Sequence, residues 1–274
     1  MPPTVHAWFE PEMLVGVEAH RYRFERVVGF GGFGSVYLAT SPQGEERAVK
    51  VLYPPHSRSS HDLQAWANRA AHFLREVQIV AHFDHKNIIK IYDTGYVYWC
   101  FDDPLKGQEG HHDRSGDYLL PYHVTEYIPD GLDRHVRGDQ RFAPEDVVGI
   151  GAQICGGLAA LHSSNPRVLH RDLNPGNIRL AEGRRAVITD FGVARFADVP
   201  PGGITIEIIP PDVAAPEQLA GEDPDARTDI YQVGALLFAM LTGKFPREAD
   251  VPTLLDAKGV AQGPGPGGAP VPDD

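Results

Sequence analysis

The sequence predicts an α+β fold in which a small β-sheet with one long helix precedes a mainly helical part. Short runs rich in β-branched and aromatic residues, separated by Gly-bearing turns, fill residues 22–53. One helical pattern follows at 62–83, and two more apolar helical patterns come later, at 144–162 and 230–241. Strands grouped before helices, without strict alternation, are typical of an α+β protein.

Five segments of the chain are expected to form the strands of the sheet. They are predicted at 22–28, 35–40, 47–53, 88–98 and 122–128, with a short additional strand at 187–189. The long helix is predicted because apolar residues recur at helical spacing between Asp62 and Phe83. The polar stretch Trp99–Leu119 has no periodicity and is predicted to be a surface insertion, and the Gly- and Pro-rich residues 259–274 are predicted to be a linker or tail.

Composition excludes several classes of function. The chain has 274 residues, 42% of them hydrophobic, and a formal net charge of −12, which repels nucleic acid. No apolar run is long enough to span a bilayer, and the first ten residues do not resemble a signal peptide. The two cysteines form no disulfide scaffold or metal spacing. We therefore expect a cytoplasmic protein without a membrane segment in this chain.

A Gly-rich stretch, Gly29-Phe30-Gly31-Gly32-Phe33-Gly34-Ser35-Val36, interrupts the first two strands. Glycines let backbone amides approach phosphate oxygens closely. The motif alone also fits a dinucleotide-binding turn or a plain hairpin. A strand follows it where a dinucleotide-binding turn requires a helix, which favours a hairpin that covers phosphates.

Lys50 lies on the third predicted strand, in Ala48-Val49-Lys50. A lysine on a strand that otherwise looks buried needs an anionic partner, although a lone lysine is more often solvated. Glu76 shares the helix face of Phe73 and Val80 and can supply that carboxylate. The pair would direct the ammonium group toward phosphates.

Three further motifs complete an ordered set. They are His170-Arg171-Asp172-Leu173-Asn174-Pro175-Gly176-Asn177, Asp190-Phe191-Gly192 and Ala215-Pro216-Glu217. With the Gly-rich loop and Lys50, the chain from about Tyr22 to Pro246 resembles the eukaryotic-type (Hanks-type) protein kinases, specifically the bacterial Ser/Thr kinases. The resemblance implies a two-lobed fold, with an N-terminal extension at 1–20, an N-lobe and hinge at 21–128, a C-lobe at 129–258 and a tail at 259–274.

The resemblance also implies the roles of individual residues. Asp172 would accept or orient the proton of the substrate hydroxyl, with Arg171 and Asn174 beside it as further catalytic residues. Lys50, held by Glu76, would contact the α- and β-phosphates, and Asn177 and Asp190 would bind Mg²⁺, or Mn²⁺ in its place. ATP would be the phosphate donor and a protein the acceptor. The nucleotide would contact Gly29, Phe30, Gly31, Gly32, Phe33, Gly34, Val36, Ala48, Lys50, Thr125, Glu126, Ile128 and Arg179.

The sequence departs from the family at several positions. Asn174 replaces a lysine that meets the γ-phosphate, and Pro210 replaces a threonine that bonds to the same lysine and the catalytic aspartate. Arg179 stands where the family has an apolar residue under adenine. The C-lobe is expected to be shortened, so that Glu217 lacks its usual arginine partner and a homodimer or a partner domain would cover the helix at 230–241.

Thr205 is the only hydroxyl residue between Asp190 and Glu217, and a phosphate there could order the loop through Arg171. Three functions are compatible with the motifs. They are an active protein kinase, which the complete set of five polar residues favours; a pseudokinase or nucleotide-binding scaffold; and a phosphotransferase acting on a small molecule.

Overall fold

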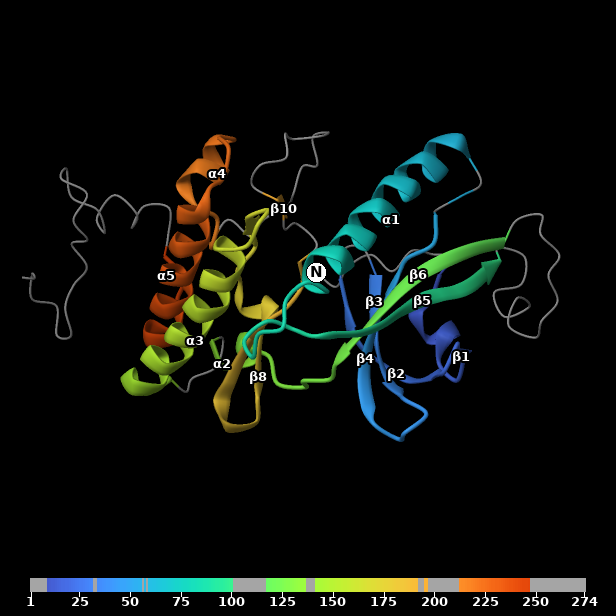
Figure 1. The fold of residues 1–274 in the computed structure, drawn as a ribbon, viewed down its shortest axis with the longest axis horizontal. Coiled ribbons are helices and arrows are strands. Elements are labelled where there is room, and N and C mark those ends of the chain that lie inside the picture. The colour runs from blue at the N-terminus through green and yellow to red at the C-terminus, as the bar shows by residue number, and fades with distance from the viewer. Residues whose placement is uncertain are drawn as a thin grey trace, which may run out of the picture. The chain divides into compact units, whose positions relative to one another are not determined.

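The computed structural model describes residues 9–31, 34–55, 57, 59–100, 117–136, 141–191, 195–196 and 212–246 (Figure 1). The chain divides into two compact units. The first comprises Met1–Pro129 together with Val187–Ala194, and the second comprises Asp130–Ala186 together with Arg195–Asp274. The return of the chain to the first unit at Val187 places Asp190 with the sheet.

The first unit contains a six-stranded antiparallel sheet with the order β1-β2-β3-β4-β6-β5. Its strands are β1 (Glu18–Ala19), β2 (Tyr22–Phe30), β3 (Gly34–Thr40), β4 (Glu46–Leu52), β5 (Ile91–Cys100) and β6 (Asp117–Glu126). Successive residues of a strand point to opposite faces, so Val49 and Val51 face away from Lys50. The sheet therefore has two faces with different partners.

The N-terminal segment covers the face that carries Val49 and Val51. Phe9 and Leu14, the latter in the 3-10 helix η1 (Pro11–Leu14), are buried in a cluster with Tyr37, Val49 and side chains of β2, β5 and β6. The hydroxyl of Tyr37 donates to the carbonyl of Pro11 at 2.9 Å. Residues predicted to be a mere extension thus complete the hydrophobic core on this side of the sheet.

Helix α1 (Ser60–Val80) packs against the face that carries Lys50. The hydroxyl of Ser59 accepts the amide of Asp62 and so caps the first turn, which is why the helix begins two residues before the predicted position. The ring of Phe73 in α1 lies 5.1 Å from the ring of His123 in β6, which is paired with Lys50 of β4. Phe73, Glu76, Ile79 and Val80 form the buried stripe of the helix.

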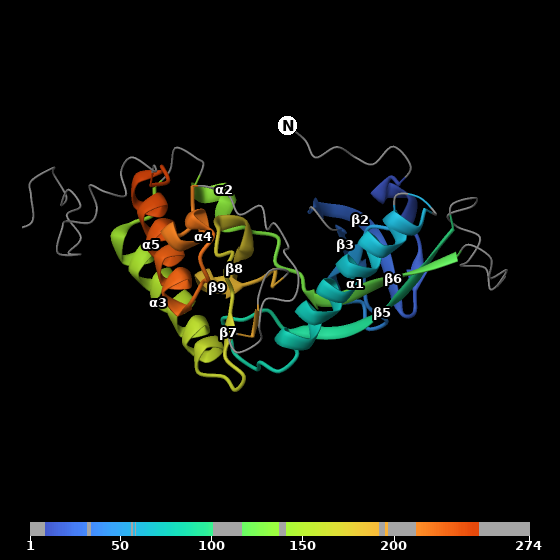
Figure 2. The same cartoon turned by 90° about the horizontal axis from the view of Figure 1, so that it is seen from above.

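The second unit is mainly helical. Helices α3 (Pro144–His162) and α5 (Ala226–Thr242) lie side by side, accompanied by α2 (Leu132–Val136) and α4 (Pro216–Ala220) (Figure 1 and Figure 2). Gly151 permits the close approach, since a Cβ there would lie 2.9 Å from a methyl of Leu237. Short strands β7 (Val168–Leu169) and β10 (Arg195–Phe196) pair with each other, and β8 (Ile178–Ala181) pairs with β9 (Arg185–Ile188).

The hairpin of β5 and β6 is longer than the sequence predicted. Its ladder continues to the pairs Trp99↔Tyr118 and Cys100↔Asp117, so both ends of the predicted insertion at 99–119 belong to strands. Backbone pairing extends this ladder where side-chain periodicity gave no signal. At its other end β5 begins at Ile91, because Ile88 makes an isolated parallel bridge to Ile188.

None of the helices in the described part of the chain combines the length and the apolar character that crossing a bilayer requires.

Gly34 provides a test of the packing between β3 and β4. A Cβ at Gly34 would lie 2.2 Å from the carbonyl oxygen of Val51, whereas one at Gly29 would meet only the Cβ of Val36 at 3.8 Å. We therefore expect Gly34→Ala to lower the free energy of unfolding by about 1–3 kcal/mol, measured by chemical denaturation without nucleotide. The matched variant Gly29→Ala should stay close to the wild-type value. Equal stability of the two variants would contradict the register of β3 and β4.

Candidate active site

The ammonium group of Lys50 contacts two carboxylates of the first unit. Its Nζ lies 3.2 Å from Oε2 of Glu76 in α1 and 2.8 Å from Oδ1 of Asp190 in the segment after β9. The Glu76 side chain is 4% exposed and the Asp190 side chain 48% exposed. The sequence predicted these three residues to act together, and the structure brings them into contact.

The neighbouring backbone fixes both carboxylates. The amide of Phe191 donates to Oε1 of Glu76 at 3.0 Å, which ties α1 to the segment that carries Asp190. Phe191 itself is buried, at 1% exposure. Asp190 has a φ of +58°, a left-handed conformation that costs a non-glycine residue about 1–3 kcal/mol. The surrounding contacts hold this residue in a conformation that directs its carboxylate toward Lys50.

The charges of this triad, formed by Lys50, Glu76 and Asp190, shift the pKa values of Lys50 and Glu76. Burial alone lowers the pKa of Lys50, but the carboxylates of Asp190 and Glu76 outweigh it, and the pKa is raised. Burial raises the pKa of Glu76, and the negative charge of Asp190 adds to this while Lys50 opposes it. With two carboxylates around one ammonium, Lys50 keeps its proton and the site carries surplus negative charge. A cation beside Asp190 would offset that charge.

The residues predicted to contact adenine share the face of the sheet that carries Lys50. In the ladders, Val36 pairs with Lys50, and Lys50 and Ala48 pair with His123 and Thr125. Residues paired across an antiparallel ladder point to the same face. Thr125 is half-buried and Ile128 buried, with Glu126 between them at the end of β6.

The described part of the Gly-rich turn is compact. The amide of Gly31 donates to the carbonyl of Gly34 at 2.8 Å, and the Phe30 side chain is 52% exposed. Gly32 and Phe33 lie outside the described residues.

In the second unit, two asparagines hold Asp172. Nδ2 of Asn177 donates to Oδ2 of Asp172 at 2.9 Å and to its carbonyl at 2.8 Å. Nδ2 of Asn174 donates to Oδ1 of Asp172 at 3.0 Å, while Oδ1 of Asn174 accepts the amide of Gly176 at 2.9 Å. Each carboxylate oxygen therefore receives a side-chain amide, which fixes the orientation of the carboxylate.

A buried aspartate anchors the loop that carries Asp172. Asp229 at the start of α5 is fully buried and accepts the amides of His170 at 3.0 Å and Arg171 at 2.7 Å. Its Oδ2 also lies 2.7 Å from Nε2 of His162. Arg171 has a φ of +71°, which this pair of amide bonds helps to maintain.

Two glutamines strengthen the same anchor, and the sequence analysis missed both. Oε1 of Gln232 accepts the amide of Leu173 at 2.8 Å, and the Nε2 groups of Gln232 and Gln218 both donate to the carbonyl of Arg171. Gln232 is fully buried within the apolar pattern of α5. A polar residue three positions after Asp229, on the same helix face, is the signal that could have identified it.

Some predicted residues have other surroundings than the sequence suggested. Glu217 was expected to lack an evident partner, but the hydroxyl of Thr228 donates to its Oε1 at 2.5 Å, because the first turn of α5 lies beside α4. Arg179 in β8 makes a backbone bridge to Gly131, and its guanidinium lies beside that residue. Thr205 and Pro210 lie outside the described residues, as does the chain after residue 246.

His123 is a further residue that the sequence analysis missed. It is buried at 6% exposure and neither ring nitrogen has a hydrogen-bond partner among the described residues. Burial, together with the nearby charge of Lys50, lowers its pKa to about 3. A neutral imidazole therefore stands next to the Lys50 triad, where a charged one would repel the ammonium group.

Comparison with known proteins identifies the family of the chain. Residues 22–262 match the family described as protein kinase domain, and the chain belongs to that family. The match extends beyond Pro246, where the sequence motifs had ended. The α+β fold, with a sheet and one long helix in the first unit and helices in the second, is that of this family.

Several bacterial relatives are similar over most of the chain. The probable serine/threonine-protein kinase PknB of Corynebacterium glutamicum is 31% identical over 255 residues, which cover 91% of this chain and 36% of the relative. The serine/threonine-protein kinase PknB of Mycolicibacterium smegmatis is 31% identical over 252 residues, which cover 90% and 36%. The serine/threonine-protein kinase PksC of Streptomyces coelicolor is 32% identical over 244 residues, which cover 86% and 39%. The chain thus spans little more than a third of the length of these relatives.

The unpartnered imidazole of His123 predicts an unusual dependence of stability on pH. Below about pH 6.5 the unfolded chain binds a proton at this residue, and the folded chain does not until about pH 3. Stability is therefore lost as the pH falls through this window. The variant His123→Phe keeps a ring against Phe73 and removes the titration. We expect the wild type to lose about 2 kcal/mol more than the variant between pH 7 and pH 5, measured by urea unfolding.

Replacing His123 also removes two buried nitrogens that have no hydrogen-bond partner in the described part of the chain, so the variant should be at least as stable as the wild type at pH 7. Parallel pH profiles of the two proteins would show that His123 is hydrated or paired in solution, against this interpretation.

Proposed function

We propose that this chain is the catalytic domain of a serine/threonine-protein kinase, which transfers the γ-phosphate of ATP to a hydroxyl of a protein substrate. The contact of Lys50 with both Glu76 and Asp190 carries the proposal. An apolar residue would pack at this position as well as a buried ammonium held by two carboxylates, so packing alone does not account for Lys50. Its position beside a Gly-rich turn suits the binding of phosphate oxygens.

The residues of both units fit a nucleotide with a divalent metal ion. Carboxylate and amide oxygens are the hard ligands that Mg²⁺ prefers, and Asp190 and Asn177 would provide them. The half-exposed carboxylate of Asp190 has surplus negative charge around it, which suits a cation. The metal would neutralise charge on the phosphates. Mn²⁺ prefers the same oxygen ligands, so this chemistry supports Mg²⁺ and Mn²⁺ equally.

Asp172 would receive the substrate hydroxyl. Its two oxygens are oriented by Asn174 and Asn177, so the carboxylate presents a fixed face to an incoming group. Phosphoryl transfer requires mainly positioning and charge neutralisation, and an aspartate held in this way orients the hydroxyl and accepts its proton. Arg171, whose carbonyl and amide are both bonded, keeps the loop in place beside it.

Asn174 gives the proposed reaction a particular character. Where the resembling kinases have a lysine directed at the γ-phosphate, this chain has an amide that bonds to Asp172. The amide can donate a hydrogen bond but carries no positive charge. A slower chemical step is therefore proposed for this chain than for a kinase with the lysine, since charge near the transferring group stabilises the transition state.

The location and partners of the protein follow as proposals. We place the domain in the cytoplasm, where ATP is available. The exposed side chains of Ile230 and Leu241 on α5 leave apolar surface, which a homodimer or a partner domain would cover.

A transfer assay tests the proposal. Purified chain, γ-labelled ATP, Mg²⁺ and a generic protein substrate should give label on the substrate or on the chain itself. Asp172→Asn should reduce the label by at least about 10³-fold, because the hydroxyl loses its proton acceptor.

The other outcomes separate the competing functions. Tight ATP binding without any transfer would contradict catalysis and support a pseudokinase or scaffold. Consumption of ATP only when a small metabolite is added would instead support a phosphotransferase for small molecules. Label that persists unchanged in Asp172→Asn would reveal a contaminating kinase.

A further inference from the structure

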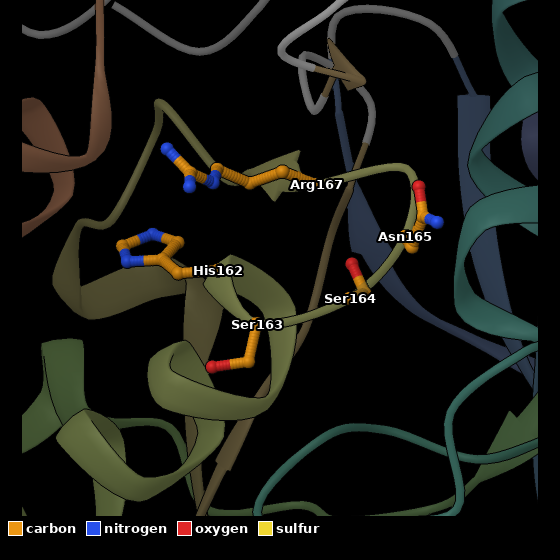
Figure 3. Close-up of a pocket in the computed structure, with 5 residues that line it drawn as sticks. All are labelled: His162, Ser163, Ser164, Asn165 and Arg167. Atoms are coloured by element: carbon orange, nitrogen blue, oxygen red, sulfur yellow. The ribbon is translucent and has the colours of Figure 1, made fainter.

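An open cavity of about 450 Å³ lies at the end of α3 in the second unit. It is lined by His162, Ser163, Ser164, Asn165 and Arg167 (Figure 3). None of the residues predicted to bind nucleotide or metal lines it. The volume lies within the usual range of small-ligand sites, about 300–1,000 Å³, and exceeds what a lone phosphate fills.

The lining of this cavity favours an anion. It has hydroxyl, amide, imidazole and guanidinium groups and no carboxylate. Arg167 is exposed and makes no ion pair among the described residues, and in Figure 3 its guanidinium lies on the same side of the loop as the imidazole of His162. Guanidinium groups bind phosphate and carboxylate with paired hydrogen bonds.

The helix end beside the cavity does not oppose an anion as strongly as a bare helix terminus would. The carbonyl of Leu161 in the last turn of α3 accepts the hydroxyl of Ser164 at 2.6 Å and its amide at 3.3 Å. These bonds occupy one of the carbonyls at the negative end of the helix dipole. Arg167 supplies the guanidinium charge of the cavity lining.

His162 connects the cavity to the loop that carries Asp172. Its Nε2 lies 2.7 Å from the buried Oδ2 of Asp229, which also accepts the amide of His170. The other oxygen of Asp229 accepts the amide of Arg171, one residue before Asp172. One side chain thus separates the cavity from the anchor of the loop.

We propose that this cavity binds a phosphate group through Arg167 and His162, and that the bound phosphate stiffens the loop that carries Asp172. Nε2 of His162 bonds to Asp229, so the ligand would bond to the other ring nitrogen, Nδ1. A ligand at Nδ1 would hold the imidazole ring in place against Asp229, the residue that anchors the loop. The ligand is free inorganic phosphate or the phosphate ester of a protein side chain, for which the cavity has room.

Calorimetric titration with inorganic phosphate tests the site directly. The full chain is compared with Arg167→Gln and with Arg134→Gln, which removes an exposed arginine of α2 that does not line the cavity. We expect about tenfold weaker binding for Arg167→Gln, the effect of losing a charge-assisted contact, and wild-type binding for Arg134→Gln. Equal affinity of all three proteins, or no binding to the wild type, overturns the proposal.

A second comparison separates this cavity from the nucleotide site. The proposal predicts that Lys50→Met still binds phosphate and that Arg167→Gln binds it more weakly. If Lys50→Met lost phosphate binding and Arg167→Gln kept it, the phosphate would lie at the Lys50 triad, and the assignment to the cavity would be overturned. Because binding is measured without ATP turnover, the result does not depend on whether the chain transfers phosphate.

Amide hydrogen exchange tests the link to the loop. With saturating phosphate, the amides of His170 and Arg171 should exchange more slowly in the wild type and not in Arg167→Gln, since both donate to Asp229. Binding without any change at these amides would overturn the coupling. A phosphoserine peptide distinguishes the two sources, because tighter binding than inorganic phosphate identifies an ester and weaker binding identifies free phosphate.

Discussion

The ammonium group of Lys50, held between two carboxylates, is the interaction on which the first unit depends. It joins β4, α1 and the segment after β9, which are distant in sequence. Loss of Lys50 would leave the buried carboxylate of Glu76 without its cation, at a cost of about 3–5 kcal/mol. The amide of Phe191 on Glu76 reinforces the same junction, so the position of α1 and that of Asp190 are not independent. The proposed binding of a phosphate and a metal ion would account for an arrangement that costs desolvation and backbone strain.

The second unit solves a different problem, which is to hold a loop without regular structure. Asp229, Gln218 and Gln232 bond to the backbone of His170, Arg171 and Leu173, and two asparagines orient Asp172. These partners are mostly buried, so the bonds are strong relative to those at a surface. The first unit thus holds a charged triad, and the second holds an oriented carboxylate.

Sequence reasoning identified the charged residues because their spacing carries information. Glu76 shares a helix stripe with Phe73 and Val80, and Lys50 interrupts an apolar strand. It missed His123 and Gln232, whose importance arises from neighbours far away in the chain. It also missed the packing of Phe9 and Leu14, since a short irregular segment has no periodicity to detect. The strand pairs Trp99↔Tyr118 and Cys100↔Asp117 depend on backbone register, which side-chain patterns do not report.

The most direct test of this account is a crystal structure of the chain with Mg²⁺ and a non-hydrolysable ATP analogue. The account predicts a phosphate oxygen within hydrogen-bond distance of Lys50 Nζ, with Glu76 still paired to it, and a metal ion bound by Asp190 and Asn177. A nucleotide bound elsewhere, or one whose phosphates lie far from Lys50 while that residue keeps both carboxylates, would contradict the central claim.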